Sequence, residues 1–314
     1  MKSWYKAVIM VPSQSRARPE AVGLLPAEPG VYRFRDSQGR ALYLGRAGDL
    51  RKRVGSYWGE LRNRKHLRRM IPQIAAIEAL VLSSEHEAAW AERMLLEHRK
   101  GRWNRIAGGL ENPVWIRVDT SIPSIAVVHE VVEAPGLRWY GPYLGGTATR
   151  LAVAGLERVY PMTYARSRLT GTERDLARIH GVVESDAEGM LDAVDRVLGR
   201  DAEAIAEARS GLIMKREQAA GSELYEVASR IHDELGGLDW VVAPCRLLGT
   251  PDLDLAATHD GTQLRLKFRA GRLRTWDQSP ANGATTPAAA EWHDLLQRNA
   301  TLASTLAAHP VRSS

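Results

Sequence analysis

Two short apolar runs near the start of the chain have the pattern of paired β-strands. Residues 30–32 read Gly-Val-Tyr and residues 43–45 read Tyr-Leu-Gly, with a turn sequence at 36–39 between them. Strand-forming residues on both sides of an Asp/Gly-containing turn predict a β-hairpin. On antiparallel neighbours, Tyr32 and Tyr43 can face the same side of the sheet, where two phenols can act together on a phosphate or a water.

A helical pattern with an unusual member follows the hairpin. Asp49 is a suitable N-cap, and apolar residues then recur at helical spacing at Leu50, Val54, Tyr57, Trp58 and Leu61. Arg53 lies inside this apolar stripe. Burying a guanidinium costs several kcal/mol unless an anion meets it, and a phosphate ester matches its paired donors. The pattern therefore predicts that Arg53 contacts a phosphate.

A second helix is predicted to begin after Ser84, since residues 84–87 read Ser-Glu-His-Glu, the sequence of a capping box. Its apolar face contains Ala88, Ala91 and Leu95, and Glu92 lies beside that face. Glu92 is the best single candidate for a metal ligand. The helix is expected to end before Asn104, ahead of a glycine pair.

The rest of the chain alternates between strand and helix patterns. Strands are predicted at 114–118 and 124–128, with a small β unit that ends at 139–143, and a helix at 147–160. Helical patterns continue from 187 to 238. Further strands are expected at 253–257, 263–268 and 273–276, a linker at 279–287 and a last helix at 288–306. The overall class is α+β.

Charge is concentrated in the first part of the chain. The whole chain has a formal net charge of +6, and Lys and Arg clearly outnumber Asp and Glu between residues 33 and 105. Such a cluster suits contact with a phosphate backbone, and an ordinary solvated face is the alternative. The candidate DNA-binding residues are Arg51, Lys52, Arg62, Arg64, Lys65, Arg68 and Arg69.

Cysteine content and hydropathy indicate the compartment. Cys245 is the single cysteine, so an internal disulfide is excluded. No apolar run approaches membrane-spanning length, and the first residues do not resemble a secretory signal. We therefore expect a cytoplasmic protein with no membrane partner.

The ordered set of motifs from Leu25 to Asn104 resembles the GIY-YIG endonuclease domain found at the N-terminus of UvrC, the incision subunit of bacterial nucleotide excision repair. The resemblance implies a small mixed sheet and a hydrolytic site that uses one divalent metal, Mg²⁺ or Mn²⁺. Glu92 matches the metal-binding glutamate, Arg53 the arginine that steadies the scissile phosphate, and Asn104 a supporting asparagine. These residues predict cleavage of a phosphodiester bond.

The remaining catalytic candidates are Tyr32, Tyr43, Tyr57 and Arg46. One of the two motif tyrosines is implied to help deprotonate the attacking water, and we favour Tyr43. A phenol with a pKa of about 10 is a poor base at neutral pH, so Arg46 or another nearby cation is expected to favour its phenolate. Arg46 stands where these nucleases often have lysine, which keeps the charge but prevents a role as proton acceptor.

The resemblance to UvrC continues beyond this domain and then departs from it. A Gly-Pro-aromatic stretch at 141–143 precedes a helix, as in UvrC. UvrC proteins commonly bind an iron–sulfur cluster through cysteines that follow this helix, and residues 161–186 contain none, so no such cluster is expected. Residues 222–238 resemble the UVR helix by which UvrC meets UvrB, and an ordinary helical hairpin is the alternative. The stripe is formed by Leu224, Val227, Ala228, Ile231, Leu235 and Leu238, with Arg230, Asp233 and Glu234 expected on the opposite, polar side.

These observations predict an organisation like that of the N-terminal half of UvrC, and similar to Cho, a UvrC-like nuclease that makes a 3′ incision. The expected divisions are an N-terminal extension (1–24), the nuclease domain (25–106), a middle β/α region without cluster cysteines (107–186), a helical UVR-like region (187–242) and a C-terminal segment (243–314) with a β-hairpin, linker and helix.

The expected function is a metal-dependent, structure- or damage-specific DNA endonuclease that acts on damaged or distorted double-stranded DNA, with UvrB as a partner through 222–238. The alternative is a noncatalytic DNA-binding or repair-assembly protein with a degenerate nuclease site. A nuclease outside general repair, such as a self-resistance or mobile-element enzyme, is a third reading.

Overall fold

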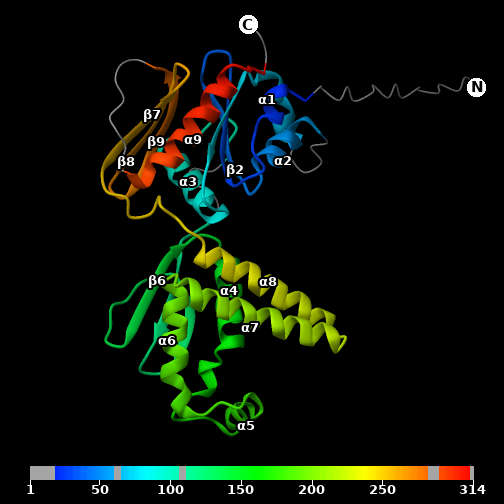
Figure 1. Ribbon diagram of the computed structural model, residues 1–314, viewed down its shortest axis with the longest axis vertical. Helices are drawn as coiled ribbons and strands as arrows, with labels where there is room; N and C mark the ends of the chain where they lie inside the picture. The colour runs from blue at the N-terminus through cyan, green and yellow to red at the C-terminus, as the bar shows by residue number, and fades with distance from the viewer. Residues whose placement is uncertain (1–17, 60–64, 106–110, 282–289, 312–314) are drawn as a thin grey trace, which may run out of the picture.

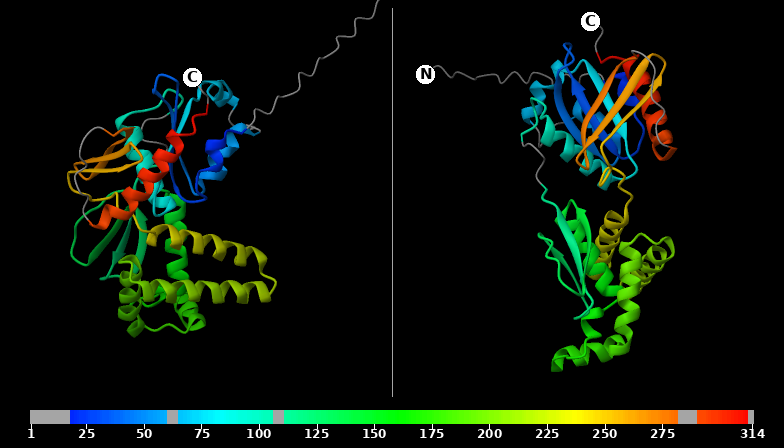
Figure 2. Two further views of the ribbon diagram at one scale, coloured as in Figure 1. Left: turned by 45° about the horizontal axis from the view of Figure 1, so that its top comes forward. Right: turned by 90° about the vertical axis from the view of Figure 1, so that its left-hand side faces the viewer.

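The chain folds into two lobes joined at a narrow junction (Figure 1). The computed structural model describes residues 18–59, 65–105, 111–281 and 290–311. Residues 18–105 and 243–311 form the upper lobe, and the residues between 111 and 242 form the lower lobe (Figures 1 and 2). The first and last parts of the described chain therefore belong to one lobe.

The first sheet of the upper lobe contains the predicted hairpin. Its strands are β1 (Gly30–Arg35), β2 (Ala41–Ala47) and β3 (Ala76–Val81), all antiparallel in the order β2-β1-β3, so that β2 forms an edge. Tyr32 pairs with Gly45 and Phe34 with Tyr43. The side chains of Tyr32, Phe34 and Tyr43 belong to the core on one face.

Short helices cover that face. They are α1 (Glu20–Gly23), α2 (Leu50–Gly55) and the 3₁₀ turns Ser56–Trp58, Lys65–Arg69 and Ile71–Gln73. Asp49 caps α2 as predicted, because its side chain accepts a hydrogen bond from the Lys52 N–H at 2.8 Å. The helix is shorter than its apolar stripe suggested: it ends at Gly55, Tyr57 and Trp58 lie in the following 3₁₀ turn, and Leu61 lies outside the described residues.

The opposite face of this sheet packs against α3 (Glu85–His98) and the C-terminal segment. That segment forms a second antiparallel sheet, β7 (Leu253–His259), β8 (Thr262–Arg269) and β9 (Arg272–Pro280), followed by α9 (Ala290–Ala307). Strand β9 continues two residues into the predicted linker at 279–287, most of which lies outside the described residues. Asn299 of α9 accepts from the Val81 N–H at 2.6 Å and donates to the Val81 carbonyl at 3.0 Å, so α9 is anchored to β3.

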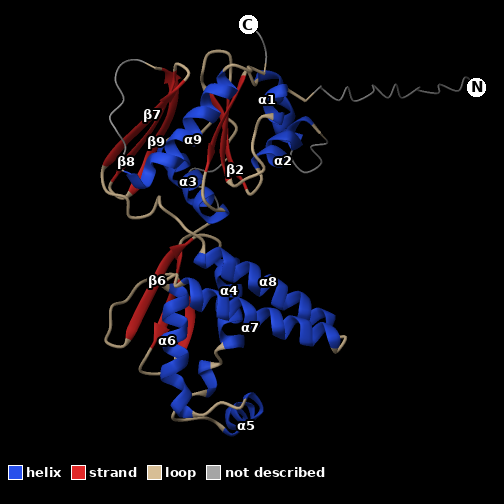
Figure 3. Ribbon diagram, viewed as in Figure 1, coloured by secondary structure: helices blue, strands red, loops and turns tan. Residues whose placement is uncertain are grey.

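The lower lobe combines a sheet with a group of helices. Its strands are β4 (Val114–Asp119), β5 (Ser124–Val128) and β6 (Leu137–Tyr143), in the order β5-β4-β6. The helices are α4 (Gly146–Val159), α5 (Gly171–His180), α6 (Ala187–Leu198), α7 (Ala202–Gly221) and α8 (Tyr225–Val242), with 3₁₀ turns at Met162–Tyr164 and Glu184–Asp186. Helices α7 and α8 form a long hairpin that projects from the lobe (Figure 3). The β strands and α4 match the predictions closely, whereas α5 was not predicted.

The N-terminal end of α3 lies at the junction of the two lobes, where it anchors the segment that returns from the lower lobe and contacts Leu144 of that lobe. Ser84 caps the helix by accepting from the Glu87 N–H at 3.0 Å, and its hydroxyl donates to the Pro244 carbonyl at 2.8 Å. The Glu87 carboxylate accepts from the Ser83 N–H at 2.8 Å and from the Arg246 N–H at 2.7 Å, so the second half of the expected capping box is replaced by these two contacts. The buried His86 Nε2 accepts from the Trp90 indole at 3.2 Å and from the Leu144 N–H at 3.3 Å.

The mixture of helices and small sheets confirms the α+β class. Across the described ranges, we find no helix with the length and apolar content needed to span a bilayer.

Candidate active site

Three tyrosines converge on one face of the first sheet. Tyr32 lies on β1, Tyr43 on the edge strand β2, and Tyr57 in the 3₁₀ turn after α2. The Tyr32 and Tyr57 hydroxyl oxygens are 2.6 Å apart, and the Tyr43 ring centroid lies 6.2 Å from that of Tyr32 and 6.0 Å from that of Tyr57. The prediction that Tyr32 and Tyr43 share a face is confirmed, and Tyr57 joins them.

The glycine of each motif triplet makes room for this arrangement. A Cβ atom at Gly45 would lie 2.6 Å from the Tyr32 hydroxyl and 2.8 Å from a Tyr43 ring carbon. A Cβ at Gly30 would lie 2.3 Å from the Leu80 carbonyl oxygen on β3. Both distances are shorter than van der Waals contact, so neither position accepts a side chain without displacing a tyrosine or a strand.

All three tyrosines are neutral phenols at physiological pH. Burial raises the pKa of Tyr32, Tyr43 and Tyr57 well above the usual value, and the Arg53 charge, which favours the phenolate, offsets only part of that effect. A nearby cation, Arg53, thus favours the phenolate as expected, but burial has the larger effect and the net pKa of each tyrosine remains raised. Arg46 does not act on the phenols, because it binds carboxylates instead.

Arg53 has the environment that its place in the stripe predicted. It lies on α2 between the buried residues Leu50 and Val54, and its Nε atom is buried with no hydrogen-bond partner. Burial tends to lower its pKa, but the neighbouring phenols outweigh this and the pKa is raised. A guanidinium with an unused buried donor, held beside three phenols, is suited to receive an anion.

Glu92 lies on α3 at the β2 edge, where Arg46 bridges it to a second carboxylate. Arg46 Nε is 3.5 Å from Glu92 Oε2, and Arg46 Nη2 is 2.8 Å from Glu111 Oε1. Burial raises the pKa of Glu92, and Glu111 adds to this, although Arg46 lowers it. Glu111 is not among the predicted site residues, because it lies beyond Asn104 in a short stretch that contains glycines and a proline and has no strand or helix pattern. Residues 106–110 of that stretch lie outside the described residues.

The donors at this edge fit a hard divalent cation. Mg²⁺ usually keeps several waters and takes one or two carboxylates, so Glu92 alone, or with Glu111, is an adequate protein ligand set. Among the described residues, no three His, Cys, Asp or Glu side chains are grouped as a metal cage. A pair of carboxylates of this kind fits a divalent cation that keeps several of its waters.

Asn104 supports the edge strand. Its Oδ1 accepts from the Leu44 N–H at 2.9 Å, and its Nδ2 donates to the Leu44 carbonyl at 2.7 Å. Both backbone groups of the residue that follows Tyr43 are thereby held. Asn104 thus positions strand β2 through the backbone of Leu44.

An open groove of about 730 Å³ runs beside these residues. Its lining includes Arg46, Lys52, Arg53, Ser56 and Trp240, the last contributed by α8 of the lower lobe. Arg51 and Lys52 are exposed on α2, and Arg68 and Arg69 are exposed in the 3₁₀ turn at 65–69. The predicted DNA-binding residues Arg62 and Arg64 lie outside the described residues, as does the side chain of Lys65.

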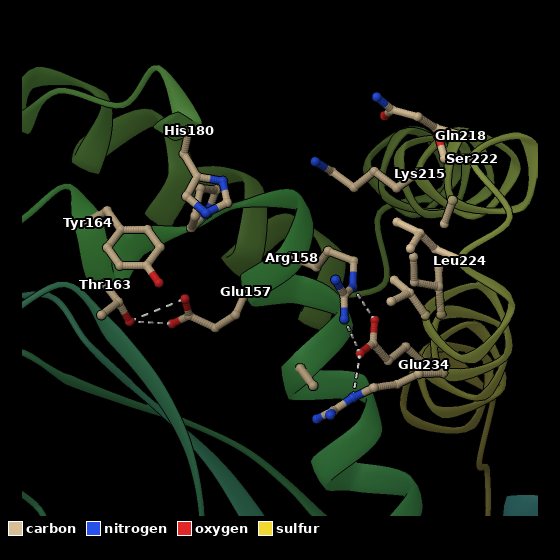
Figure 4. Close-up of a pocket in the computed structure, with 16 residues that line it drawn as sticks. Glu157, Arg158, Thr163, Tyr164, His180, Lys215, Gln218, Ser222, Leu224 and Glu234 are labelled. Atoms are coloured by element: carbon tan, nitrogen blue, oxygen red, sulfur yellow. Dashed lines mark hydrogen bonds and ion pairs between the residues drawn. The ribbon is translucent and has the colours of Figure 1, made fainter. Parts of the chain in front are cut away.

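The UVR-like helix is only partly open. Leu224 and Val227 are exposed at its start, whereas Ile231, Leu235 and Leu238 are buried against the protein's own helices. The placement of Glu234 on the polar side was wrong: it is fully buried and accepts hydrogen bonds from Arg158 Nε at 2.6 Å and Nη2 at 2.8 Å (Figure 4). These groups border a cavity of about 560 Å³ between α4, α7 and α8, which also contains Tyr164 and His180 (Figure 4).

We compared the chain with known protein families and with curated relatives. Residues 28–105 match the sequence model of the UvrC-like GIY-YIG domain. UvrABC system protein C from Geobacter metallireducens is 29% identical over 269 residues, covering 79% of this chain and 43% of that protein. The Frankia casuarinae protein of the same name is 32% identical over 243 residues, covering 69% of this chain and 33% of the relative. The chain thus spans less than half the length of these curated relatives.

The solved structures include the GIY-YIG N-terminal endonuclease domain of UvrC from Thermotoga maritima, bound to its catalytic magnesium. It is 30% identical, covers 27% of this chain and 91% of that chain, and has a TM-score of 0.25. The family match over residues 28–105 and the curated relatives, which extend well beyond that segment, agree with the ordered motifs and with the tyrosine cluster they build. The chain is a UvrC-like GIY-YIG protein.

Proposed function

We propose that this protein is a metal-dependent endonuclease that hydrolyses a phosphodiester bond in double-stranded DNA, with an incision role like that of UvrC. The observation that carries the proposal is the convergence of three phenols, the unpartnered Arg53 donor and the Glu92 carboxylate beside one basic groove. Each group supplies a separate requirement of phosphodiester hydrolysis.

Glu92, with Glu111 close by, would hold one Mg²⁺ or Mn²⁺ ion. The bound cation would neutralise charge on the phosphate and assist the departing oxygen. Arg53 binds the non-bridging oxygens of the scissile phosphate, using the Nε donor that lacks a partner in the free protein. Arg46 lies beside Glu92 Oε2, so the second carboxylate oxygen, Oε1, would remain available to the cation while Arg46 holds the side chain in place.

The tyrosines position the attacking water. With raised pKa values they enter the reaction as neutral phenols that accept a hydrogen bond from the attacking water. Tyr43 is the least buried of the three tyrosines and is on the edge strand β2, so we assign it the contact with the attacking water. The bond from Tyr32 to Tyr57 fixes the orientation of the two inner phenols.

Lesion selection is proposed to come from a partner. Phosphate contacts position a protein on DNA but carry no sequence information, and Arg46, Lys52 and Arg53 of the groove lining are suited to contacts of that kind. Exposed apolar residues gather at the tip of the α7–α8 hairpin, namely Leu224, Tyr225 and Val227. This tip is our candidate for the UvrB contact, and damaged or distorted DNA in the cytoplasm is the proposed substrate.

The decisive test is Glu92→Gln. It should abolish cleavage of a lesion-bearing duplex in Mg²⁺ or Mn²⁺, assayed with and without UvrB, while DNA affinity and the melting temperature change little. Glu97→Gln is the matched control, since Glu97 lies on the same helix and its side chain is 25% exposed against 23% for Glu92. Cleavage by Glu92→Gln at the wild-type rate would remove Glu92 from the mechanism.

A noncatalytic DNA-binding role is the second candidate, favoured by one observation: Arg46 already neutralises Glu92. Under this reading, the wild-type protein binds the duplex but does not cut it with either metal. The same assay separates the two functions.

A further inference from the structure

A second, smaller cavity lies on the opposite face of the first sheet from the tyrosines. It has a volume of about 230 Å³ and is enclosed by β1, β2, the C-terminal end of α3 and β9. Because side chains alternate along a strand, Arg33 and Arg35 point away from Tyr32 and Phe34 and toward this cavity. The charged and titratable residues of its lining are Arg33, Arg35, Arg40, His98, Arg99, Arg274 and Asp277.

The arginines of this pocket outnumber the carboxylates that can pair with them. The buried Glu78 is shared by Arg33 and Arg35, whose Nε atoms lie 2.5 and 2.6 Å from its two oxygens. Asp36 pairs with Arg40 at 2.8 Å. In the described part of the chain, neither Arg99 nor Arg274 makes an ion pair. An excess of guanidinium groups around a partly enclosed space favours an anion there.

Buried donors without acceptors line the same pocket. Arg33 Nη2, Trp276 Nε1 and Thr275 Oγ1 are all buried and have no hydrogen-bond partner. Trp276 is only 1% exposed, and the Arg33 guanidinium lies 4.5 Å from the centroid of its ring. Unpartnered buried donors are rare in folded proteins, and the two that lie together here, Arg33 Nη2 and Trp276 Nε1, indicate a missing acceptor, whereas Thr275 lies on the other face of β9.

We propose that this pocket binds a phosphate group. A phosphate offers acceptors on every non-bridging oxygen and matches the paired donors of arginine, so it would satisfy both the charge excess and the unpartnered donors. The pocket requires the C-terminal segment, because Arg274, Thr275 and Trp276 all come from β9.

The phosphate has two chemical sources. Arg99, the C-cap of α3, follows Glu92 by seven residues, about 10 Å along the helix axis, so a DNA strand bound at Glu92 would have neighbouring phosphates within reach of the pocket. One source is therefore a flanking phosphate of the DNA strand, and this form rests on the function proposed above. The other is a small phosphorylated ligand.

Tryptophan side-chain NMR tests the pocket directly. The chain contains nine tryptophans, and Trp276→Phe identifies the Trp276 indole signal. Titration of the whole protein with inorganic phosphate should move that signal to saturation. The double variant Arg99→Ala/Arg274→Ala should weaken the phosphate affinity about tenfold or more. Arg174→Ala, which removes an exposed arginine from α5 of the other lobe, should leave the affinity unchanged.

A second titration identifies the source. A duplex oligonucleotide added to Glu92→Gln protein should move the same signal and compete with phosphate if the DNA strand enters the pocket. Response to phosphate but not to the duplex assigns the pocket to a small phosphorylated ligand. No response to inorganic phosphate, or an equal response in the double variant, overturns the proposal. This readout does not require cleavage, so it is independent of whether the nuclease proposal holds.

Discussion

Arg53 shows how a single side chain separates stability from function. Its Nε is buried without a partner among apolar neighbours, an arrangement that costs free energy in the isolated protein. Such a cost is expected where a group is reserved for a ligand rather than for the fold.

Arg53→Ala should therefore reduce the cleavage rate by about a hundredfold or more, by analogy with removal of one transition-state donor, with little loss of stability. Single-turnover cleavage and thermal melting measure the two effects. Arg174→Ala, which removes an exposed arginine of α5 in the other lobe, is the control and should cut nearly normally. A large fall in melting temperature for Arg53→Ala would instead make it a structural residue.

Strand β2 is the element on which the site depends, because it is a sheet edge and contains Tyr43 and Arg46. The segment that ends at Asn104 lies along this edge: Trp103 N–H donates to the Leu42 carbonyl at 2.8 Å, and Asn104 holds both backbone groups of Leu44.

Asn104→Ala should cost about 1–3 kcal/mol of stability, since the two Leu44 groups lose their partner. It should also speed hydrogen exchange at the Leu44 amide and slow cleavage, because Tyr43 is no longer fixed. Exchange mass spectrometry and melting test this, with exposed Asn112→Ala as the control. Unchanged exchange in β2 would contradict the positioning role.

The apolar stripe of α8 contains both exposed and buried residues. Val227→Asp should preserve the melting temperature and weaken UvrB-stimulated incision, because Val227 is 40% exposed. Ile231, at 1% exposure, should unfold the lobe when changed to Asp, so it is unsuitable as a probe of the partner. Val131→Asp, at 44% exposure near β5, is the matched control. Normal stimulation of Val227→Asp would exclude this tip as the docking surface.

Local sequence patterns predicted the individual helices and strands better than the long-range contacts between them. The tyrosine hairpin, the Asp49 cap and the helix with Glu92 follow from spacing alone, since the side-chain period decides which residues share a face. Spacing does not identify what covers that face. Two ion pairs, Arg158–Glu234 and Arg46–Glu111, join residues that are far apart in the sequence. No local pattern could predict them.

At the scale of the whole molecule, His86 at the junction of the two lobes makes the stability of the protein depend on pH. It is 1% exposed, and burial lowers its pKa to about 4, from a usual value of 6.5. The unfolded chain therefore binds a proton between these values that the folded protein does not, and stability decreases as pH falls from about 6.5 to 4, by about 3 kcal/mol from this group.

His86→Gln keeps an acceptor for Leu144 and Trp90 but cannot titrate. The melting temperature of the variant minus that of the wild type should increase as the pH is lowered from 7 to 4.5. Parallel melting curves at several pH values test the prediction. A difference between the two proteins that does not change with pH would exclude His86 as the titrating group.

Both connections between the lobes meet α3, where Arg93 contacts the Glu111 carbonyl and Glu87 binds the Arg246 amide. Six residues separate these anchor points, a distance of about 9 Å along the helix. In engineering terms, the two ends of the lower lobe lie close together on α3. A short glycine-rich bridge could replace residues 114–242 and leave the nuclease lobe closed, whereas removal of the C-terminal segment would expose the core beside α3.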